Sequence, residues 1–189
     1  DLFLNDSSLR HMGSLNHTYT NPVQLSEEDG RIFLFWRGVD GKPCWSYSDD
    51  RGSTWSTGEI LFMPKRTYGF RRPYTKVCSE GKGTIHFTFT DGHPRKEKHN
   101  SIYYMRYRDG AFYRADGSLI KTAEELPVRP EEADLVYDAA KSGKKAWNWD
   151  IAATETGQPV VAYAKFPNDS NHIYGYARWT GETWKNYEL

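Results

Sequence analysis

The sequence predicts an all-β fold, a β-propeller of four-stranded antiparallel blades, with about three blades in its 189 residues. A strand-like run, a polar turn with glycine and an apolar run recur at 21–38, 74–92 and 148–166. Each copy continues with a third strand, a turn and a short fourth run, as in a propeller blade. Aromatic residues make up 15% of the chain, which suits buried strands and sugar-binding surfaces.

We expect one domain over residues 1–189, divided in the order in which the repeats occur. Blade 1 should cover about 17–63, blade 2 about 70–121 and blade 3 about 147–189, with an insertion at 122–146. Three blades are fewer than the four to eight that usually close a propeller, so we expect a partial propeller or one completed by a homo-oligomer.

Local signals support the individual elements. Gly30, Gly83 and Gly157 end the first polar turn of each copy, and we expect them to take positive φ. Consecutive apolar residues at Ile32–Trp36 predict a strand buried on both faces between blades. Helix formers at Glu131–Ala140 predict a short helix in the insertion, with a plain loop as the alternative.

The turn after the third strand of blade 1 has the spacing S-x-D-x-G-x-T-W, an Asp-box. Its residues are Ser48, Asp50, Gly52, Thr54 and Trp55. We expect Asp50 to accept hydrogen bonds from the turn's N–H groups, Gly52 to allow the reversal and Trp55 to pack under the turn. Weaker versions in the other copies favour a structural turn over a catalytic loop.

Composition excludes several function classes. With 25 Lys and Arg against 25 Asp and Glu, the net charge is zero, so no nucleic-acid partner is expected. No apolar run approaches the roughly 20 residues of a membrane span, and no signal peptide is visible, so the compartment stays unknown. The two cysteines show no metal-binding spacing, so no metal site and no cofactor are predicted, with a structural metal left open.

Several stretches carry a family resemblance: HTYTNPVQLSEEDGRIFLFWRG, FTDGHPR, NSIYYMRYRDGAFYRADGS and PEEADLVYDAAKSGKKAWNWD. From about His17 onward they resemble the BNR-4 group of sialidase-like propeller proteins, which includes ulvan lyases and related enzymes acting on acidic, rhamnose-containing polysaccharides. The resemblance implies a propeller fold, a carbohydrate-active function and an extracellular or periplasmic location. Gly38 and Val39 stand where the family has a second histidine after strand two of the first blade.

The residues that enter the innermost strand of each blade, and those that leave the second strand, should line the axial funnel. There we expect His17 and His93 as catalytic residues, His17 because it resembles the family's histidine, and Tyr68 or Tyr74 to complete a proton-transfer pair. The substrate-binding candidates are Arg72, Arg95, Arg37, Asn21, Trp36, Trp149 and Asp150. Arginine binds carboxylates bidentately, and tryptophan rings stack on sugars.

These residues suggest a polysaccharide lyase that acts by β-elimination on a uronate-containing polymer. Such a reaction needs a base for the C5 proton, an acid for the leaving oxygen and a cation for the carboxylate. One alternative is a sialidase-like glycoside hydrolase, which would need a carboxylate pair from Asp40, Asp91 and Asp150. Another is a noncatalytic carbohydrate-binding or assembly module. In each case the expected partner is an acidic polysaccharide or oligosaccharide, and no membrane.

Overall fold

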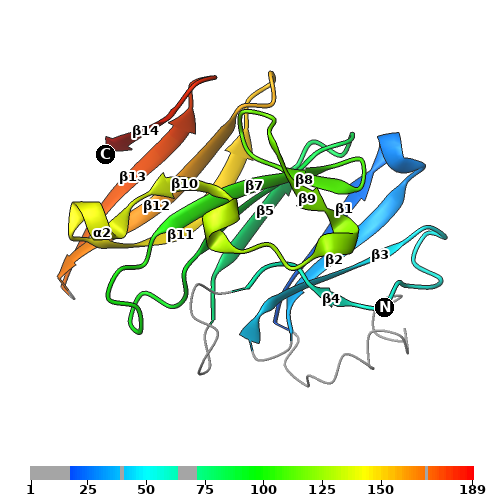
Figure 1. Cartoon of the computed structure of the whole chain (residues 1–189), viewed down its shortest axis with the longest axis horizontal. Helices are drawn as coiled ribbons and strands as arrows, with labels where there is room; N and C mark the ends of the chain where they lie inside the picture. The colour runs from blue at the N-terminus through cyan, green and yellow to red at the C-terminus, as the bar shows by residue number, and fades with distance from the viewer. Residues whose placement is uncertain (1–17, 39–40, 64–71, 169) are drawn as a thin grey trace.

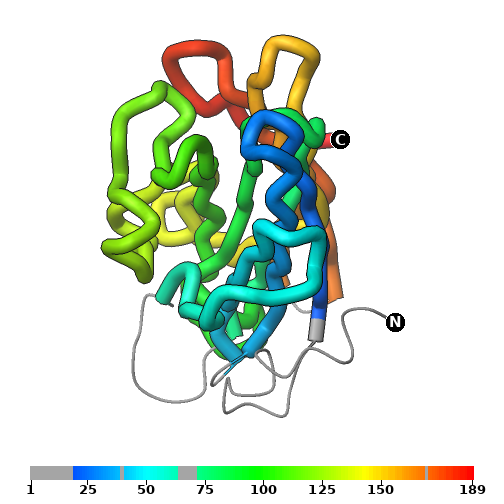
Figure 2. The backbone as a smooth tube through the Cα atoms, turned by 90° about the vertical axis from the view of Figure 1, so that its right-hand side faces the viewer, coloured from blue at the N-terminus to red at the C-terminus, as the bar shows by residue number. Residues whose placement is uncertain are grey.

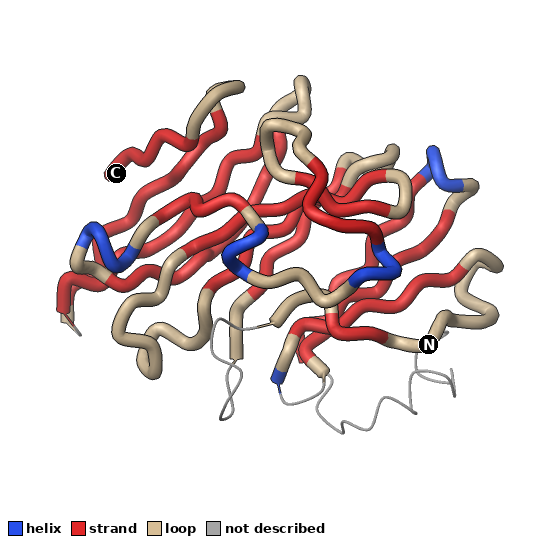
Figure 3. The backbone as a smooth tube through the Cα atoms, in the orientation of Figure 1, coloured by secondary structure: helices blue, strands red, loops and turns tan. Residues whose placement is uncertain are grey.

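The computed structural model describes residues 18–38, 41–63, 72–168 and 170–189. Strands dominate these ranges, and the helices are short (Figure 3). They form three antiparallel sheets that follow one another along the chain (Figure 1). The all-β prediction, with four-stranded antiparallel blades, is confirmed.

The first sheet has the order β1-β2-β3-β4. Its strands are β1 (Thr18–Leu25), β2 (Arg31–Arg37), β3 (Pro43–Ser48) and β4 (Glu59–Ile60). A 3₁₀ turn at Ser26–Glu28 joins β1 to β2. The third sheet has the same plan, in the order β11-β12-β13-β14. Its strands are β11 (Lys145–Ala153), β12 (Pro159–Asn168), β13 (Asn171–Trp179) and β14 (Trp184–Glu188).

The second sheet has six strands instead of four. They are β5 (Thr75–Ser79), β6 (Ile85–Thr90), β7 (Ile102–Arg108), β8 (Ala111–Tyr113), β9 (Leu119–Thr122) and β10 (Asp134–Tyr137). On the outer edge of β7, β8 pairs with Arg106–Arg108, and β10 pairs with the other half of the strand, from Ile102 to Tyr104. Two strands therefore share the outer edge of β7.

The helix predicted over Glu131–Ala140 is wrong. A 3₁₀ turn covers Pro130–Glu132, β10 follows, and helix α2 spans only Ala139–Ser142. Pairing with β7 outweighs helix propensity here, because it also buries Val136 in the core between the second and third sheets.

Two aromatic cores hold the three sheets together. Between the first and second sheets, Phe33 lies 5.0 Å from Tyr107 and Phe35 lies 5.1 Å from Phe87, measured between ring centroids. Between the second and third sheets, a second cluster contains Tyr104, Val136, Ile151, Val161 and Tyr163. All six residues of β6 are buried, because this strand faces both cores.

The hairpin turns β1–β2 and β11–β12 lie at one end of the molecule (Figure 2). Gly30 and Gly157 take φ of 79° and 76° there, as predicted. In the second sheet the prediction for Gly83 is wrong, because Gly81 adopts the positive φ, at 75°. Gly83 lies against the Glu27 side chain of the first sheet, whose carboxylate would have to move to make room for a Cβ at this position.

The Asp-box turn is held by its own side chains. Asp50 Oδ1 accepts from the Thr54 N–H at 2.7 Å and from the Ser48 hydroxyl at 2.8 Å, and Ser48 Oγ accepts from the Gly52 N–H at 2.8 Å. These bonds lower the pKa of Asp50 to about 2, and the bond from the Thr54 N–H has the largest effect. Trp55 is buried beside Trp36 on the face of β2 that points away from the second sheet.

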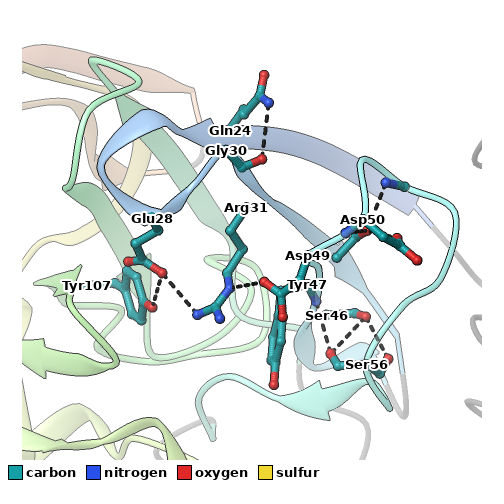
Figure 4. A network of polar contacts seen from close by, with 12 residues as sticks. Gln24, Glu28, Gly30, Arg31, Ser46, Tyr47, Asp49, Asp50, Ser56 and Tyr107 are labelled. Carbon is teal, nitrogen blue, oxygen red and sulfur yellow. Dashed lines mark hydrogen bonds and ion pairs between the residues drawn. The ribbon is translucent and has the colours of Figure 1, made fainter.

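A polar network next to this turn links the first two sheets (Figure 4). Arg31 donates to Asp49 at 2.6 Å and to Glu28 at 3.0 Å, and the Tyr107 hydroxyl of β7 donates to the same Glu28 at 3.0 Å. The Arg31 guanidinium also lies 4.7 Å from the centre of the Tyr47 ring. The turn ends of the first two blades are therefore fixed to each other.

Buried amides fix the third sheet to the second at the opposite end. Asn148 of β11 donates from Nδ2 to the carbonyl of Thr88 at 3.0 Å and to that of Tyr74 at 3.3 Å. Asn100 donates to the carbonyl of Ala146 at 2.6 Å and accepts from the Gly92 N–H at 3.0 Å. Both side chains are at most 1% exposed, so these bonds replace the hydrogen bonds to water that the backbone groups lose on folding.

Replacing Asn100→Ala should lower the free energy of unfolding by about 3 kcal/mol, because the buried Gly92 N–H and Ala146 carbonyl lose a partner. Chemical denaturation measures this difference. Asn171→Ala, at an exposed position of β13, is the control and should change stability by less than about 0.5 kcal/mol. Equal effects of the two substitutions would contradict the role given to the Asn100 amide.

His86, which the sequence places within a strand, gives a second prediction. Burial lowers the pKa of His86 to about 4, and the positive charge of Arg106 contributes less to this shift. The Nδ1 atom of His86 lies 2.8 Å from the Tyr104 hydroxyl. The unfolded chain, with an imidazole pKa near 6.5, therefore binds the proton first as the pH falls. Stability should fall between pH about 6.5 and 4, with a contribution on the order of 3 kcal/mol from this residue.

Denaturation of His86→Gln across this pH range should show a flatter dependence than the parent protein. His99→Gln, at an exposed position, should keep the parental slope. A parental slope in the His86 variant would mean that other groups cause the loss.

Candidate functional site

A cavity of about 220 Å³ lies where the three innermost strands approach one another, at the strand ends opposite the hairpin turns. The start of β1, the end of β2, the residues before and within β5 and the first half of β11 form its walls. The side chains considered below are Tyr19, Arg37, Tyr74, Trp147, Asn148 and Trp149. No Asp or Glu is among the described residues that line it.

Arg37 is the central cation of this cavity. Its guanidinium carbon lies 4.5 Å from the centre of the Tyr19 ring and 4.6 Å from that of the Tyr74 ring. Both distances are typical of cation–π contacts, which fix the guanidinium plane while its N–H groups can still bind an anion. The site therefore holds a preorganised positive charge between two phenol rings.

Tyr74, His93 and Trp147 form an aromatic group beside Arg37. Their ring centroids lie 5.5 Å apart for Tyr74 and His93, 4.7 Å for Tyr74 and Trp147, and 5.7 Å for His93 and Trp147. The backbone N–H of Arg95 donates to His93 Nδ1 at 3.0 Å. The neutral imidazole therefore carries its proton on Nε2, where it can donate to a ligand.

Positive charges surround His93. Partial burial lowers the pKa of His93 first, and Arg95, Arg37, Arg72 and Lys96 lower it further. The imidazole is consequently neutral at pH 7. The same field that disfavours a second N–H proton on the ring attracts a carboxylate or a sulfate ester.

Two β-bulges aim aromatic rings at the cavity. The register of β1 shifts between Thr18 and Asn21, and Tyr19 adopts φ of 60° with 61% of its surface exposed. The register of β11 shifts between Asn148 and Asp150, and the intervening Trp149 is 48% exposed. Bulges re-aim side chains, and a bulky residue at positive φ is strained, so both features are typical of functional sites.

The structure brings together most of the residues predicted for the funnel. Arg37 and Tyr74 line the cavity, the His93 ring contacts that of Tyr74, and the charges of Arg72 and Arg95 act on His93. Asn21 lines the cavity and donates to the Tyr19 carbonyl at 2.8 Å, and Trp149 lines it as well. The predicted catalytic residues His17 and Tyr68 lie outside the described residues.

Trp36 lines the cavity, as predicted for a funnel residue, but little of its surface is exposed. It is 4% exposed and packs with Leu34, Cys44 and Trp55. A Cβ at Gly38 would lie 2.8 Å from both Trp36 Nε1 and Cys44 Sγ. This packing explains why no side chain stands at Gly38, where the family resemblance led us to look for a histidine.

Neither of the described carboxylates considered for a hydrolase lines the cavity. Asp91 is 2% exposed and accepts from the Ser101 N–H at 2.7 Å and the Tyr103 hydroxyl at 2.9 Å, so it serves the fold. Asp150 contributes to the raised pKa of Cys78, at the end of β5 away from Tyr74. Asp40 lies outside the described residues.

Sequence reasoning missed Asn148. Its Oδ1 is buried without a hydrogen-bond partner among the described residues, and the side chain lines the cavity. A ligand hydroxyl or a water molecule can satisfy this acceptor. The available signal was the stretch AWNWD, in which a polar residue separates two tryptophans at a strand position that should face the core.

Two further findings concern the described part of the chain. None of its helices has the length and apolar character to cross a membrane. It contains no group of three or more His, Cys, Asp or Glu side chains arranged to hold a metal ion.

Solved structures with a similar fold are carbohydrate-active enzymes. An ulvan lyase of polysaccharide lyase family 25, bound to -[GlcA(1-4)Rha3S]-, matches with a TM-score of 0.71 and 18% identity, over 90% of this chain and 43% of its own. A Hadza microbial sialidase matches with a TM-score of 0.57 and 14% identity, over 92% of this chain and 37% of its own. A Penicillium chrysogenum α-L-arabinanase complexed with arabinobiose matches with a TM-score of 0.54 and 15% identity, over 94% of this chain and 51% of its own. The chain thus spans about half, or less, of the length of these proteins.

The curated proteins contain no significant match to the sequence. The model of the BNR repeat-containing family matches residues 5–189, almost the whole chain. Together with the three antiparallel sheets and the Asp-box turn, this match settles the family: the chain belongs to the BNR repeat-containing proteins.

Proposed function

We propose that this protein is a polysaccharide lyase that cleaves a uronate-containing polymer by β-elimination. The observation that carries the proposal is the Arg37 guanidinium between Tyr19 and Tyr74, with His93 beside them in a field of four positive side chains. Elimination next to a carboxylate requires such a field, because negative charge builds up on the carboxylate as the C5 proton leaves.

The chemistry divides among the described residues as follows. Arg37, with Arg72 and Arg95 near it, binds the uronate carboxylate and stabilises the enolate-like charge. Tyr74, acting as a phenolate, takes the C5 proton and then passes it to the leaving O4, so that the C5–H and C4–O4 bonds break, the C4–C5 double bond forms and the residue returns to its starting state. The Nε2–H of His93 donates a hydrogen bond to the leaving O4, since Nδ1 already accepts from the Arg95 N–H.

The family and the similar structures support the coarser statement that the protein is carbohydrate-active. A hydrolase receives less support, because no described carboxylate lines the cavity. A noncatalytic carbohydrate-binding module would use the same cations and rings without turnover, and the first experiment below distinguishes it.

Tyr74→Phe removes the hydroxyl and keeps the ring that contacts Arg37. The rate of elimination should fall at least about 100-fold, the usual contribution of a positioned proton-transfer group. The measurement is the ultraviolet absorbance of the unsaturated uronate formed from uronate polymers. Tyr187→Phe, on the exposed strand β14, is the matched control and should keep the parental rate.

An unchanged rate in Tyr74→Phe would remove the proton-transfer role from this residue. Binding of a uronate polymer by the parent protein, with no unsaturated product from any polymer, would favour the noncatalytic module.

Arg95→Gln should raise the pKa of His93, because a nearby positive charge disappears. The titration of the His93 ring protons, followed by NMR, should move to higher pH. Arg108→Gln, at an exposed arginine at the far end of β7, should leave the titration unchanged. A His93 titration that stays in place or moves to lower pH would contradict the assigned field.

A further inference from the structure

Two buried oxygen atoms at the cavity have no hydrogen-bond partner in the part of the chain that the structure describes. They are Asn148 Oδ1, on β11, and Thr75 Oγ1, on β5, the strand that packs against β11. Both residues line the cavity. A polar atom that is shielded from water and left unpaired is costly, so two of them at one cavity indicate a ligand that supplies the missing bonds.

The orientation of the Asn148 amide follows from its own hydrogen bonds. Its Nδ2 donates to the carbonyl of Thr88 at 3.0 Å and to that of Tyr74 at 3.3 Å. A half-turn of the amide would bring its oxygen against these two carbonyl oxygens, which have no hydrogen to donate. Oδ1 is therefore fixed as an acceptor, and its partner must be a group that donates a hydrogen.

Thr75 adds the complementary capacity. It follows Tyr74, whose carbonyl the Asn148 amide reaches, so the two unpaired oxygens belong to adjacent positions on neighbouring strands. A threonine hydroxyl can donate as well as accept. A ligand group that donates to Asn148 and bonds Thr75 in either direction satisfies both atoms.

A hydroxyl group meets these requirements, and charged groups do not. A carboxylate or a sulfate has no hydrogen to donate, so it would face the Asn148 oxygen with a negative charge. An ammonium group would have to lie in the same cavity as the Arg37 guanidinium, where like charges repel. The chemistry of this part of the cavity is therefore that of a neutral hydroxyl.

A uronate unit in the proposed elimination has such hydroxyls left over. Arg37 binds the carboxylate on C5, while Tyr74 and His93 act on the C5 proton and the leaving O4. C1 carries the link to the next sugar. The hydroxyls on C2 and C3 are the donors of the ring that remain for Asn148 and Thr75.

We propose that Asn148 and Thr75 bind a free C2 or C3 hydroxyl of the uronate unit that Arg37 holds, and that they select uronates unsubstituted at that carbon. The inference rests on the proposed function and adds a specificity that charge alone does not give. A methyl ether, an acetate or a sulfate on that oxygen removes the hydrogen that Asn148 Oδ1 requires, and a site built for a hydroxyl discriminates strongly against a ligand without it.

The test measures binding by titration calorimetry, in a Tyr74→Phe background so that no ligand is consumed. The probes are a 4-linked oligoglucuronate and its 2-deoxy and 3-deoxy counterparts of equal length. Thr75→Val keeps the side-chain shape and removes the hydroxyl, and its control is Thr156→Val, at an exposed position of the β11–β12 turn.

Asn148→Ala removes the acceptor together with two bonds to the backbone. Its control is Asn100→Ala, which removes a buried amide of the same kind that does not belong to the described lining of the cavity. Thr75→Val should keep the parental stability, because the hydroxyl that it removes has no partner among the described residues.

With the parental cavity, we expect one deoxy probe to bind about 10-fold more weakly than the oligoglucuronate. In Thr75→Val and in Asn148→Ala this difference should shrink to about 3-fold or less, because the hydroxyl has lost a partner. Both controls should keep the full difference. The deoxy probe that shows the loss identifies the carbon whose hydroxyl is bound.

Equal affinity of the parental cavity for all three probes would overturn the inference and leave the two oxygens with ordered water only. So would a deoxy penalty that persists unchanged in both Thr75→Val and Asn148→Ala. The lyase is tested apart from this: hydroxyl-dependent binding without unsaturated product would refute elimination and leave the inference in place. Elimination with no dependence on either hydroxyl would do the reverse, and no binding of any probe would refute both.

Discussion

The arrangement of the site depends on buried amide hydrogen bonds between the second and third sheets. Asn148 of β11 reaches the carbonyls of Thr88 and Tyr74, and therefore fixes β11 against both β5 and β6. Trp147 and Trp149 flank it on the same strand, so the amide helps to position the part of β11 that carries both rings. Buried polar contacts specify register more sharply than apolar ones, because an unpaired donor or acceptor is costly there. The aromatic row beside Tyr74 thus follows from a polar constraint.

Charge is distributed in a way that the composition conceals. The chain has zero net charge, yet Arg37, Arg72, Arg95 and Lys96 all act on His93, and no described acid lines the cavity. At the opposite end, acidic side chains such as Glu28 and Asp49 are paired with Arg31. A chain with zero net charge can therefore present a positively charged funnel to an acidic polymer. A cleft lined by charges of one sign accelerates the encounter with an oppositely charged ligand.

The sequence was informative where structure is local. Repeated strand–turn–strand units with turn glycines predicted the three sheets, and funnel positions predicted Arg37, Tyr74 and His93, because chain direction alone determines which strand ends meet. The sequence did not reveal features that depend on contacts between distant parts of the chain. β10 replaced a helix because β7 offered it an edge, Gly81 took the turn role expected of Gly83, and bulges changed the strand phase at Tyr19 and Trp149. Period-two reasoning cannot anticipate a bulge, so Trp149 was predicted from its funnel position and not from the phase of its strand.

The bulges also explain why aromatic residues, rather than acids, dominate the site. A regular strand would send alternate side chains into the core and away from it, whereas the shifts expose Tyr19 and Trp149 beside rings that are already partly buried. Flat rings separated by guanidinium groups match a ligand whose sugar faces are apolar and whose acidic groups recur along the chain. A neutral glycan would leave Arg37 without an anionic partner between its two tyrosines, and that cost disfavours it. The rigid framework therefore supports the proposal that the ligand is an acidic polymer.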